Sequence, residues 1–313
     1  MKKISSNRLT SGLEVATRIP IGTQRILLWS AWLSTLLLSK LPLIIARDIL
    51  GADIPWITPA WVGITALLVV TTFLWPILKP LRGYFSIMGV IVILNFLVYP
   101  FVQQMAAWQT FFANQFELVN LFGERILLAM ETLLVLATVL SMGMKRKDLF
   151  LTLGDLRAPV GNPPAPPKRQ KVSWPVFGTG MAILLGGLFF TLMASQSTGW
   201  NVHIINVLPW IPLILISAAL NAFAEEGMYR AAPLGTLLPV IGPRHALWLT
   251  SLWFGLGHYY GGIPSGPMGL VQTGLLAMLL GRAMLDTRGM GWSWIIHMAL
   301  DTVIYFFIAA TLV

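Results

Sequence analysis

The chain has 313 residues, of which 56% are hydrophobic and only 11% are charged. Soluble domains carry roughly 25% charged residues, so this composition excludes an ordinary water-soluble domain, and the same balance excludes a disordered chain. The absence of cysteine excludes disulfides, thiolate metal ligands and a cysteine nucleophile. The net charge of +9 comes mostly from basic residues between apolar segments, where it indicates membrane orientation and not nucleic-acid binding.

The apolar residues form blocks of about 20 residues, the length of a helical bilayer crossing. These blocks are apolar on every side, unlike the alternating strands of a membrane β-barrel. We therefore predict an all-α, polytopic integral membrane protein with eight or nine transmembrane helices. The segments near 233–243 and 259–267 are rich in glycine and proline and are predicted to be turns or partly re-entrant backbone. The predicted spans are 26–46, 60–78, 84–102, 125–144, 174–195, 207–226, 244–260, 267–285 and 291–312.

Basic residues predict how the chain is divided and oriented. Residues 1–25 hold five basic residues and one acid, so we expect this N-terminal segment in the cytoplasm. Residues 145–173 combine seven basic residues with a proline run, which favours an extended, solvated cytoplasmic loop. This loop separates a four-span membrane region, 26–144, from a C-terminal region, 174–313. In a bacterium the protein would belong to the inner membrane.

Ionisable groups at membrane depth are costly unless they are paired or face a polar cavity. The N-terminal half has two exceptions to an apolar pattern, Lys40 and Glu131. We interpret both as structural, because lysine can snorkel to the membrane surface and a glutamate can form an interhelical hydrogen bond.

The predicted sixth span ends in two adjacent carboxylates, Glu225 and Glu226. Glu226 and Arg230 are four residues apart, so they share a helix face and can form an ion pair. Glu225 points about 100° away and is left without that partner. Such a pair would combine a neutralised carboxylate with a free one that can act as a base. The alternative is that both acids mark a helix end in the headgroup region.

Two further polar patterns of this half lie in the seventh and last predicted spans. His258 follows Phe254 by four residues, and flanking glycines let another helix approach closely. His297 and Asp301 are also four residues apart, so the carboxylate can orient the imidazole. Each group taken alone is also explained by a structural role in the core.

Four ionisable side chains thus fall on three predicted helices of the C-terminal half, and one shared pocket would let them satisfy one another and hold a water. A carboxylate and an imidazole can deprotonate a water that attacks a carbonyl, and a second imidazole can stabilise the oxyanion. This combination is suited to peptide-bond hydrolysis. Ser251 and Ser293 lie outside these patterns and are interpreted as helix–helix contacts, so a covalent nucleophile has little support. The four side chains are Glu225, His258, His297 and Asp301.

Three ordered motifs, Glu225-Glu226-x-x-x-Arg230, Phe254-x-x-x-His258 and His297-x-x-x-Asp301, resemble those of the CPBP family. This family comprises CAAX-processing and bacteriocin-processing intramembrane proteases and is also called Abi or Rce1-like. The resemblance covers roughly residues 175–312 and implies a C-terminal catalytic helix bundle.

The resemblance implies a role for each matching residue. Glu225 and His258 would activate the water, and His297 and Asp301 would line the oxyanion site. Asp301 stands where the family often has asparagine, so we expect it to orient His297 and not to donate to the oxyanion directly. The supporting residues would be Glu226, Arg230 and Phe254.

The implied partners are the lipid bilayer and a membrane-associated protein or peptide, with or without a prenyl group, that is cut near its end. No nucleic acid is implied, and the sequence does not predict an oligomeric state. Zinc is an open alternative, since the family has been described both as metalloproteases and as glutamate-dependent proteases. Its ligands would be Glu225, His258 and His297, but there is no HExxH motif, so we favour hydrolysis without a metal cofactor.

A non-catalytic function is the other open alternative. A membrane scaffold, immunity factor or transporter-like protein could use the polar cluster to bind a partner. A transporter is expected to show duplicated halves with ionisable groups in both, whereas the cluster here occupies one half and no internal repeat is visible.

Overall fold

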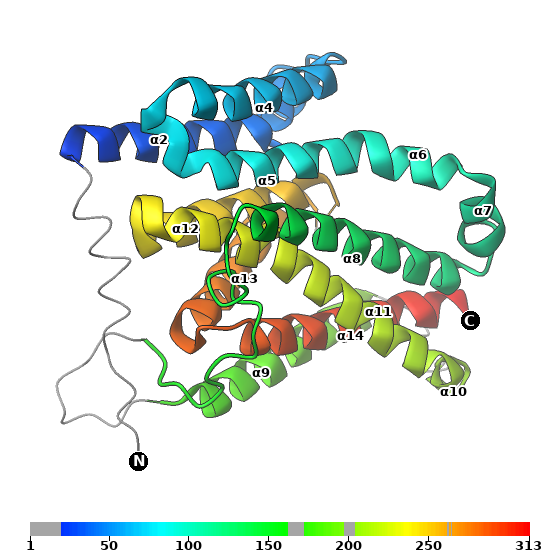
Figure 1. Cartoon of the computed structure of the whole chain (residues 1–313). Coiled ribbons are helices and arrows are strands. Elements are labelled where there is room, and N and C mark those ends of the chain that lie inside the picture. The colour runs from blue at the N-terminus through cyan, green and yellow to red at the C-terminus, as the bar shows by residue number, and fades with distance from the viewer. Residues whose placement is uncertain (1–19, 162–171, 197–203, 262, 264) are drawn as a thin grey trace.

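The computed structural model describes residues 20–161, 172–196, 204–261, 263 and 265–313. Within these ranges every regular element is helical, apart from one isolated β-bridge between Pro159 and Ser173. Figure 1 shows most helix axes running in roughly the same direction, as expected for a bundle that crosses a bilayer. The all-α polytopic architecture predicted from the sequence is therefore present. Most of the predicted N-terminal segment (1–19) and part of the basic loop (162–171) lie outside the described residues.

The N-terminal half begins with a broken helix. α2 and α3 are separated at Ser39 and Lys40 and are bent by 53° relative to each other. The proline that follows, Pro42, lies in the first turn of α3, where its missing N–H is tolerated. The elements of this half are α2 (Ile21–Leu38), α3 (Leu41–Ile44), η1 (Ile45–Ile49), α4 (Ile57–Leu74), η2 (Pro76–Leu81), α5 (Arg82–Ile93), η3 (Leu94–Val98), α6 (Tyr99–Gln104), α7 (Ala106–Trp108), η4 (Gln109–Ala113) and α8 (Glu117–Ser141).

The C-terminal half supplies the elements that carry the three motifs. α12 packs extensively on α13, α11 packs on α14 and α8, and α9 packs on α14. The N-terminal half joins this bundle mainly through α2 and α5, which contact α12, and through α8. The elements are α9 (Trp174–Gln196), α10 (Ile204–Val207), η6 (Leu208–Trp210), α11 (Ile211–Glu226), η7 (Gly227–Ala231), α12 (Ala232–Gly261), α13 (Gly266–Thr287) and α14 (Gly291–Leu312).

Six helical segments are long and apolar enough to cross a membrane, or seven if the bent α2–α3 pair is one crossing. The predicted count of eight or nine is not confirmed. α8 is not among the six, and it carries four charged residues along its length. The predicted sixth and seventh spans also merge, because residues 204–261 form one continuous helical stretch.

A single glycine reverses the direction of that stretch. α11 continues through the π-helical η7 into α12, and Gly242 adopts φ 78° and ψ 166°, a backbone conformation that favours glycine. The chain is helical up to this point, so the turn predicted over 233–243 is confined to the Gly242-Pro243 junction. Gly242 lies 17 residues after Glu225 and 16 before His258. The two arms therefore return His258 to the level of Glu225.

Gly255 allows the second arm of α12 to lie directly against α13. A Cβ atom at this position would sit 2.6 Å from the Leu270 carbonyl oxygen, so no larger residue fits without displacing α13. The other glycine beside His258, Gly257, faces open space and makes no such contact. The close approach expected from these two glycines is thus made by Gly255 alone.

The described part of the basic loop is not freely solvated. The Asp155 backbone N–H donates to the Thr287 carbonyl, and Gly161 N–H donates to the Asp286 carboxylate. A Cβ at Gly154 would lie 2.5 Å from the same Thr287 oxygen. The loop packs against the turn between α13 and α14 because its backbone N–H groups donate to acceptors there. The pattern of charge and proline in the sequence does not reveal these contacts.

Candidate active site

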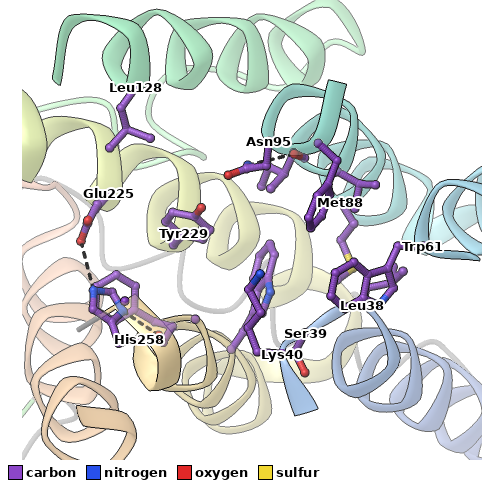
Figure 2. A pocket seen from close by; sticks show the side chains of 17 residues that line it. Leu38, Ser39, Lys40, Trp61, Met88, Asn95, Leu128, Glu225, Tyr229 and His258 are labelled. Atoms are coloured by element: carbon purple, nitrogen blue, oxygen red, sulfur yellow. Dashed lines mark hydrogen bonds and ion pairs between the residues drawn. The ribbon is translucent and has the colours of Figure 1, made fainter. Parts of the chain in front are cut away.

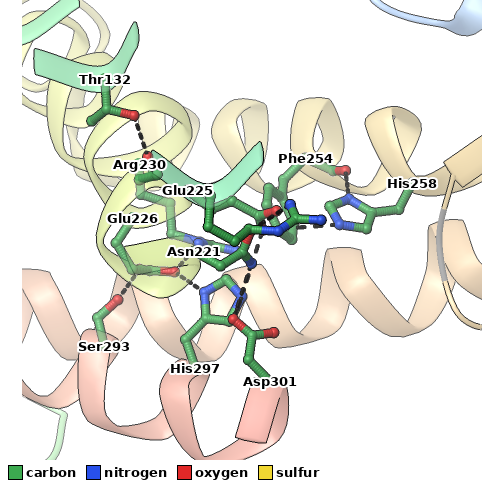
Figure 3. A network of polar contacts seen from close by, with 12 residues as sticks. Thr132, Asn221, Glu225, Glu226, Arg230, Phe254, His258, Ser293, His297 and Asp301 are labelled. Atoms are coloured by element: carbon green, nitrogen blue, oxygen red, sulfur yellow. Dashed lines mark hydrogen bonds and ion pairs between the residues drawn. The ribbon is translucent and has the colours of Figure 1, made fainter. Parts of the chain in front are cut away.

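The two adjacent glutamates lie at the point where α11 passes into η7, and they face different partners (Figure 3). Glu226 is completely buried and accepts hydrogen bonds from Arg230 and Ser293. It also accepts from His297 Nδ1 at 2.7 Å. Three donors thus compensate one buried carboxylate, as burial of a charge requires. The structure contains the Glu226–Arg230 pair predicted from the four-residue spacing.

Arg230 is held between a carboxylate and an aromatic ring. Its guanidinium carbon lies 4.0 Å from the centroid of the Phe254 ring, which is a close cation–π contact. The side chain is only 1% exposed. Phe254 therefore connects the ion pair on η7 to the helix arm that carries His258.

Glu225 is the carboxylate that remains available. Its Oε2 atom lies 3.5 Å from His297 Nε2 and 4.0 Å from His258 Nε2, and its side chain is 15% exposed. Neither distance is a direct hydrogen bond of good geometry, and a water between the groups could contact each of them. Among the described residues Glu225 has no lysine or arginine in an ion pair, in contrast to Glu226.

His258 is oriented by its own helix. Its Nδ1 atom is 2.9 Å from the Phe254 carbonyl oxygen, which can only accept, so Nδ1 carries the proton and donates. The Nε2 atom of the neutral ring is then an acceptor that points toward Glu225. The imidazole also lies 4.3 Å, centroid to centroid, from the Phe254 ring. These contacts fix both the tautomer and the direction of the ring.

His297 is oriented by Glu226 and not by Asp301. Nδ1 makes the 2.7 Å hydrogen bond to Glu226, whereas Asp301 Oδ2 lies 3.7 Å from Nε2, beyond hydrogen-bond distance. The role expected for Asp301 from the four-residue spacing therefore belongs to a carboxylate on another helix. Asp301 accepts instead from Asn221 Nδ2 at 3.0 Å.

The sequence motifs omit three side chains that belong to this network. Asn221 lies four residues before Glu225, and Ser293 lies four residues before His297, so the same-face spacing could have identified both. Ser293, interpreted above as an ordinary helix contact, is a donor to Glu226. Arg125 of α8 donates to Asn221 Oδ1 at 2.9 Å and is not indicated by any motif. The N-terminal half thus contributes directly to the site.

Two cavities meet at the Glu225–His258 pair. One, of about 290 Å³, extends from this pair to Lys40 and Trp61 in the N-terminal half (Figure 2). The other, of about 210 Å³, is lined by the imidazole of His297 and by the side chains around it. The residues that line both cavities are Glu225, Phe254, His258 and Gly261.

Of the two ionisable groups singled out in the N-terminal half, Lys40 and Glu131, only Glu131 differs from expectation. Lys40 lines the first cavity, where its Nζ lies 5.5 Å and 5.4 Å from the ring centroids of Trp61 and Phe96. Glu131 is 2% exposed, and within the described residues neither of its carboxylate oxygens has a hydrogen-bond partner. The interhelical hydrogen bond predicted for Glu131 is therefore not formed among these residues.

The described residues contain no group of three or more His, Asp or Glu side chains arranged to hold a metal ion. The set that a zinc enzyme would use is therefore not arranged as a metal site either; it comprises Glu225, His258 and His297. His297 turns Nδ1 toward Glu226, so its Nε2 atom is the one that faces Glu225.

Residues 206–303 match the family model of type II CAAX prenyl endopeptidase Rce1-like proteins. The match contains all three motifs and confirms the resemblance over this part of the chain. Neither the curated proteins nor the solved structures include a significant match. The long apolar helices and the match to a membrane protease family together identify an integral membrane protein.

Proposed function

We propose that this chain, whose residues 206–303 match the Rce1-like endopeptidases, hydrolyses a peptide bond near the end of a membrane-associated protein or peptide. The observation that carries the proposal is the position of Glu225. Among the described residues no lysine or arginine pairs with this carboxylate; two imidazoles face it, and it lies where two cavities join. A carboxylate in this setting is suited to take a proton from water.

The first step would use Glu225 and His258 together. A water held between Glu225 Oε2 and His258 Nε2 can contact both acceptors, which lie 4.0 Å apart. As the water oxygen attacks the scissile carbonyl carbon, one of its protons passes to the Glu225 carboxylate. The protonated Glu225 then gives this proton to the leaving amine nitrogen when the carbon–nitrogen bond breaks, so that the carboxylate is restored.

His297 is placed to stabilise the oxyanion. Glu226 anchors Nδ1, so Nε2 is directed at the space beside Glu225. With a proton on Nε2, the ring can donate a hydrogen bond to the negatively charged carbonyl oxygen, and a donor held in advance by its surroundings needs no reorganisation. Arg230 and Ser293 act indirectly: they donate hydrogen bonds to the Glu226 carboxylate that anchors the ring.

Asp301, held by Asn221, would border the Nε2 side of the imidazole without orienting the ring. Asp301 lies 3.7 Å from His297 Nε2, and Asn221 holds it there by donating one hydrogen bond while accepting another from Arg125. Because the asparagine oxygen accepts from a guanidinium, its amide nitrogen must face Asp301. The carboxylate at position 301, where the family often has an amide, is thus held by an amide from α11.

Cleavage of a defined peptide tests the proposal. Purified protein in liposomes is incubated with a peptide that ends in a prenylated CAAX sequence and with its unprenylated counterpart, and the products are identified by mass spectrometry. We expect one cut near the carboxyl end, which is lost in Glu225→Gln. The control Glu117→Gln changes an exposed glutamate in the first turn of α8 and should cleave normally. Binding without cleavage by the folded wild type would favour a non-catalytic scaffold.

A further inference from the structure

Lys40 occupies a break in a membrane helix and lines the cavity that also contains the candidate base. The break between α2 and α3 turns Lys40 toward the bundle, and Figure 2 shows it among the side chains of the cavity that holds Glu225 and His258. Lysine at membrane depth usually reaches toward water at the membrane surface. Lys40 instead lines the cavity that contains Glu225 and His258.

The ammonium group of Lys40 has no acidic partner among the described residues. The acids that follow it in sequence are engaged elsewhere: Asp53 pairs with Arg47 at 3.1 Å, and Asp48 accepts from the Tyr260 hydroxyl at 3.4 Å. The ammonium lies over two aromatic rings, those of Trp61 and Phe96. Cation–π contacts position a charge without neutralising it, so the hydrogen-bond donors of Lys40 remain available to an anion.

The wall between the two ends of this cavity is mostly apolar. Its apolar lining includes Met88, Ile91 and Trp253, with polar groups from Asn95 and Tyr229, and Figure 2 shows Glu225 and His258 together on one side of it. An extended peptide whose scissile carbonyl is at Glu225 would therefore run past apolar side chains before it meets the cation. A chain end suits this geometry, because its carboxylate carries a full negative charge and needs no further space beyond it.

We propose that Lys40 binds a carboxylate of the substrate, on the free carboxyl terminus of the peptide, and so selects substrates that are cut near that end. This inference rests on the proposed function and adds a specificity-determining residue from outside the family-matched segment. A lysine–carboxylate contact in a poorly solvated cavity is a charge-assisted hydrogen bond, which is stronger than a neutral one. An acidic side chain near the end of the peptide offers the same chemistry, and the experiment separates the two sources.

The test measures binding in a background that does not depend on cleavage. The protein is Glu225→Gln, and the fluorescence of cavity tryptophans reports its affinity for three prenylated CAAX peptides. The first peptide has a free carboxyl terminus and the second a terminal amide. The third also has a terminal amide but carries an aspartate as its last residue. We expect the free acid to bind about 10- to 100-fold more tightly than the amide, the range for a hydrogen bond to a charged group. Recovery of affinity by the third peptide would assign the carboxylate to a side chain and overturn the terminal assignment.

Variants at position 40 decide whether the preference comes from this lysine. Lys40→Gln should abolish the difference between acid and amide while binding the amide as before, and Lys40→Arg should keep part of it. Lys79→Gln, an exposed lysine in η2, is the matched control and should keep all of it. A preference that survives in Lys40→Gln, or an equal loss of binding for both peptides, would overturn the proposal. Cleavage by the wild type is measured separately, so a failed protease assignment and a failed Lys40 assignment give different results.

Discussion

Glu226 accepts a hydrogen bond from His297 Nδ1 at 2.7 Å, although Glu226 is not the carboxylate that faces the cavities. Neighbouring glutamates therefore have separate tasks. Glu226 is buried with an arginine and fixes the imidazole, while Glu225 faces two imidazoles and open space. The one-residue offset on a helix, about 100°, is sufficient to separate a structural carboxylate from a reactive one.

Stability should separate the two glutamates. Glu226→Gln leaves the guanidinium of Arg230 buried without its counter-charge, and breaking a buried ion pair in this way costs about 3–5 kcal/mol. We expect a clearly lower midpoint of thermal unfolding in lipid or detergent. Glu225→Gln, which removes no ion pair to arginine, should unfold close to the wild type. Equal midpoints for the two variants would contradict the division of tasks.

The contact between α12 and α13 should depend on Gly255. In Gly255→Ala the new methyl group would meet the Leu270 carbonyl oxygen and Gly274, and overpacking of this kind costs about 1–3 kcal/mol. We expect lower thermal stability and lower activity, because His258 follows on the same helix. Gly257→Ala places the same methyl group in open space and should leave the unfolding midpoint unchanged. If the two variants behave alike, the close packing at Gly255 is not what positions this arm.

Asn221 should affect turnover more than substrate affinity. Asn221→Ala removes the donor to Asp301 and leaves Arg125 without its acceptor, a loss of about 1–3 kcal/mol for groups that are largely buried. Because Asp301 borders the Nε2 atom that we assign to the oxyanion site, the effect should appear mainly in kcat. A change confined to KM would place Asn221 in substrate binding instead.

Metal chelation should leave activity intact. Glu225 and His258 can activate a water directly, and the mechanism proposed here has no step that uses a metal. We expect the cleavage rate to be unchanged by a strong chelator, with the metal content of the purified protein measured in parallel. Loss of cleavage on chelation, followed by recovery on addition of zinc, would favour the zinc-dependent alternative.

Contacts within one helix could be predicted from the sequence, and contacts between helices largely could not. The four-residue spacing of Glu226 and Arg230 predicts an ion pair that the structure contains. The same spacing suggested Asp301 as the partner of His297, but the packing of α11 against α14 brings Glu226 closer. Spacing describes one helix face, whereas the rotation of a helix relative to its neighbour depends on the whole bundle.

The contribution of the N-terminal half was likewise not apparent from its sequence. Arg125 and Lys40 belong to none of the three motifs, and their polar sequence neighbours, Glu124 and Ser39, do not indicate that either side chain reaches the site. Their roles depend on α8 packing against α11 and on the bend after α2. The hairpin at Gly242 was predicted as a broad turn, because a cluster of glycine and proline does not reveal which residue leaves the helical conformation.

The most direct test of the account is the cleavage rate of Glu225→Gln on a membrane-bound peptide substrate, compared with wild type and with Glu117→Gln. Loss of the general base should lower kcat/KM by about 10²- to 10⁴-fold, while the unfolding midpoint stays near that of the wild type. The Glu117→Gln control should cleave at the wild-type rate. A Glu225→Gln protein that still cleaves within a few-fold of the wild type would contradict the assignment of Glu225 as the base that activates water.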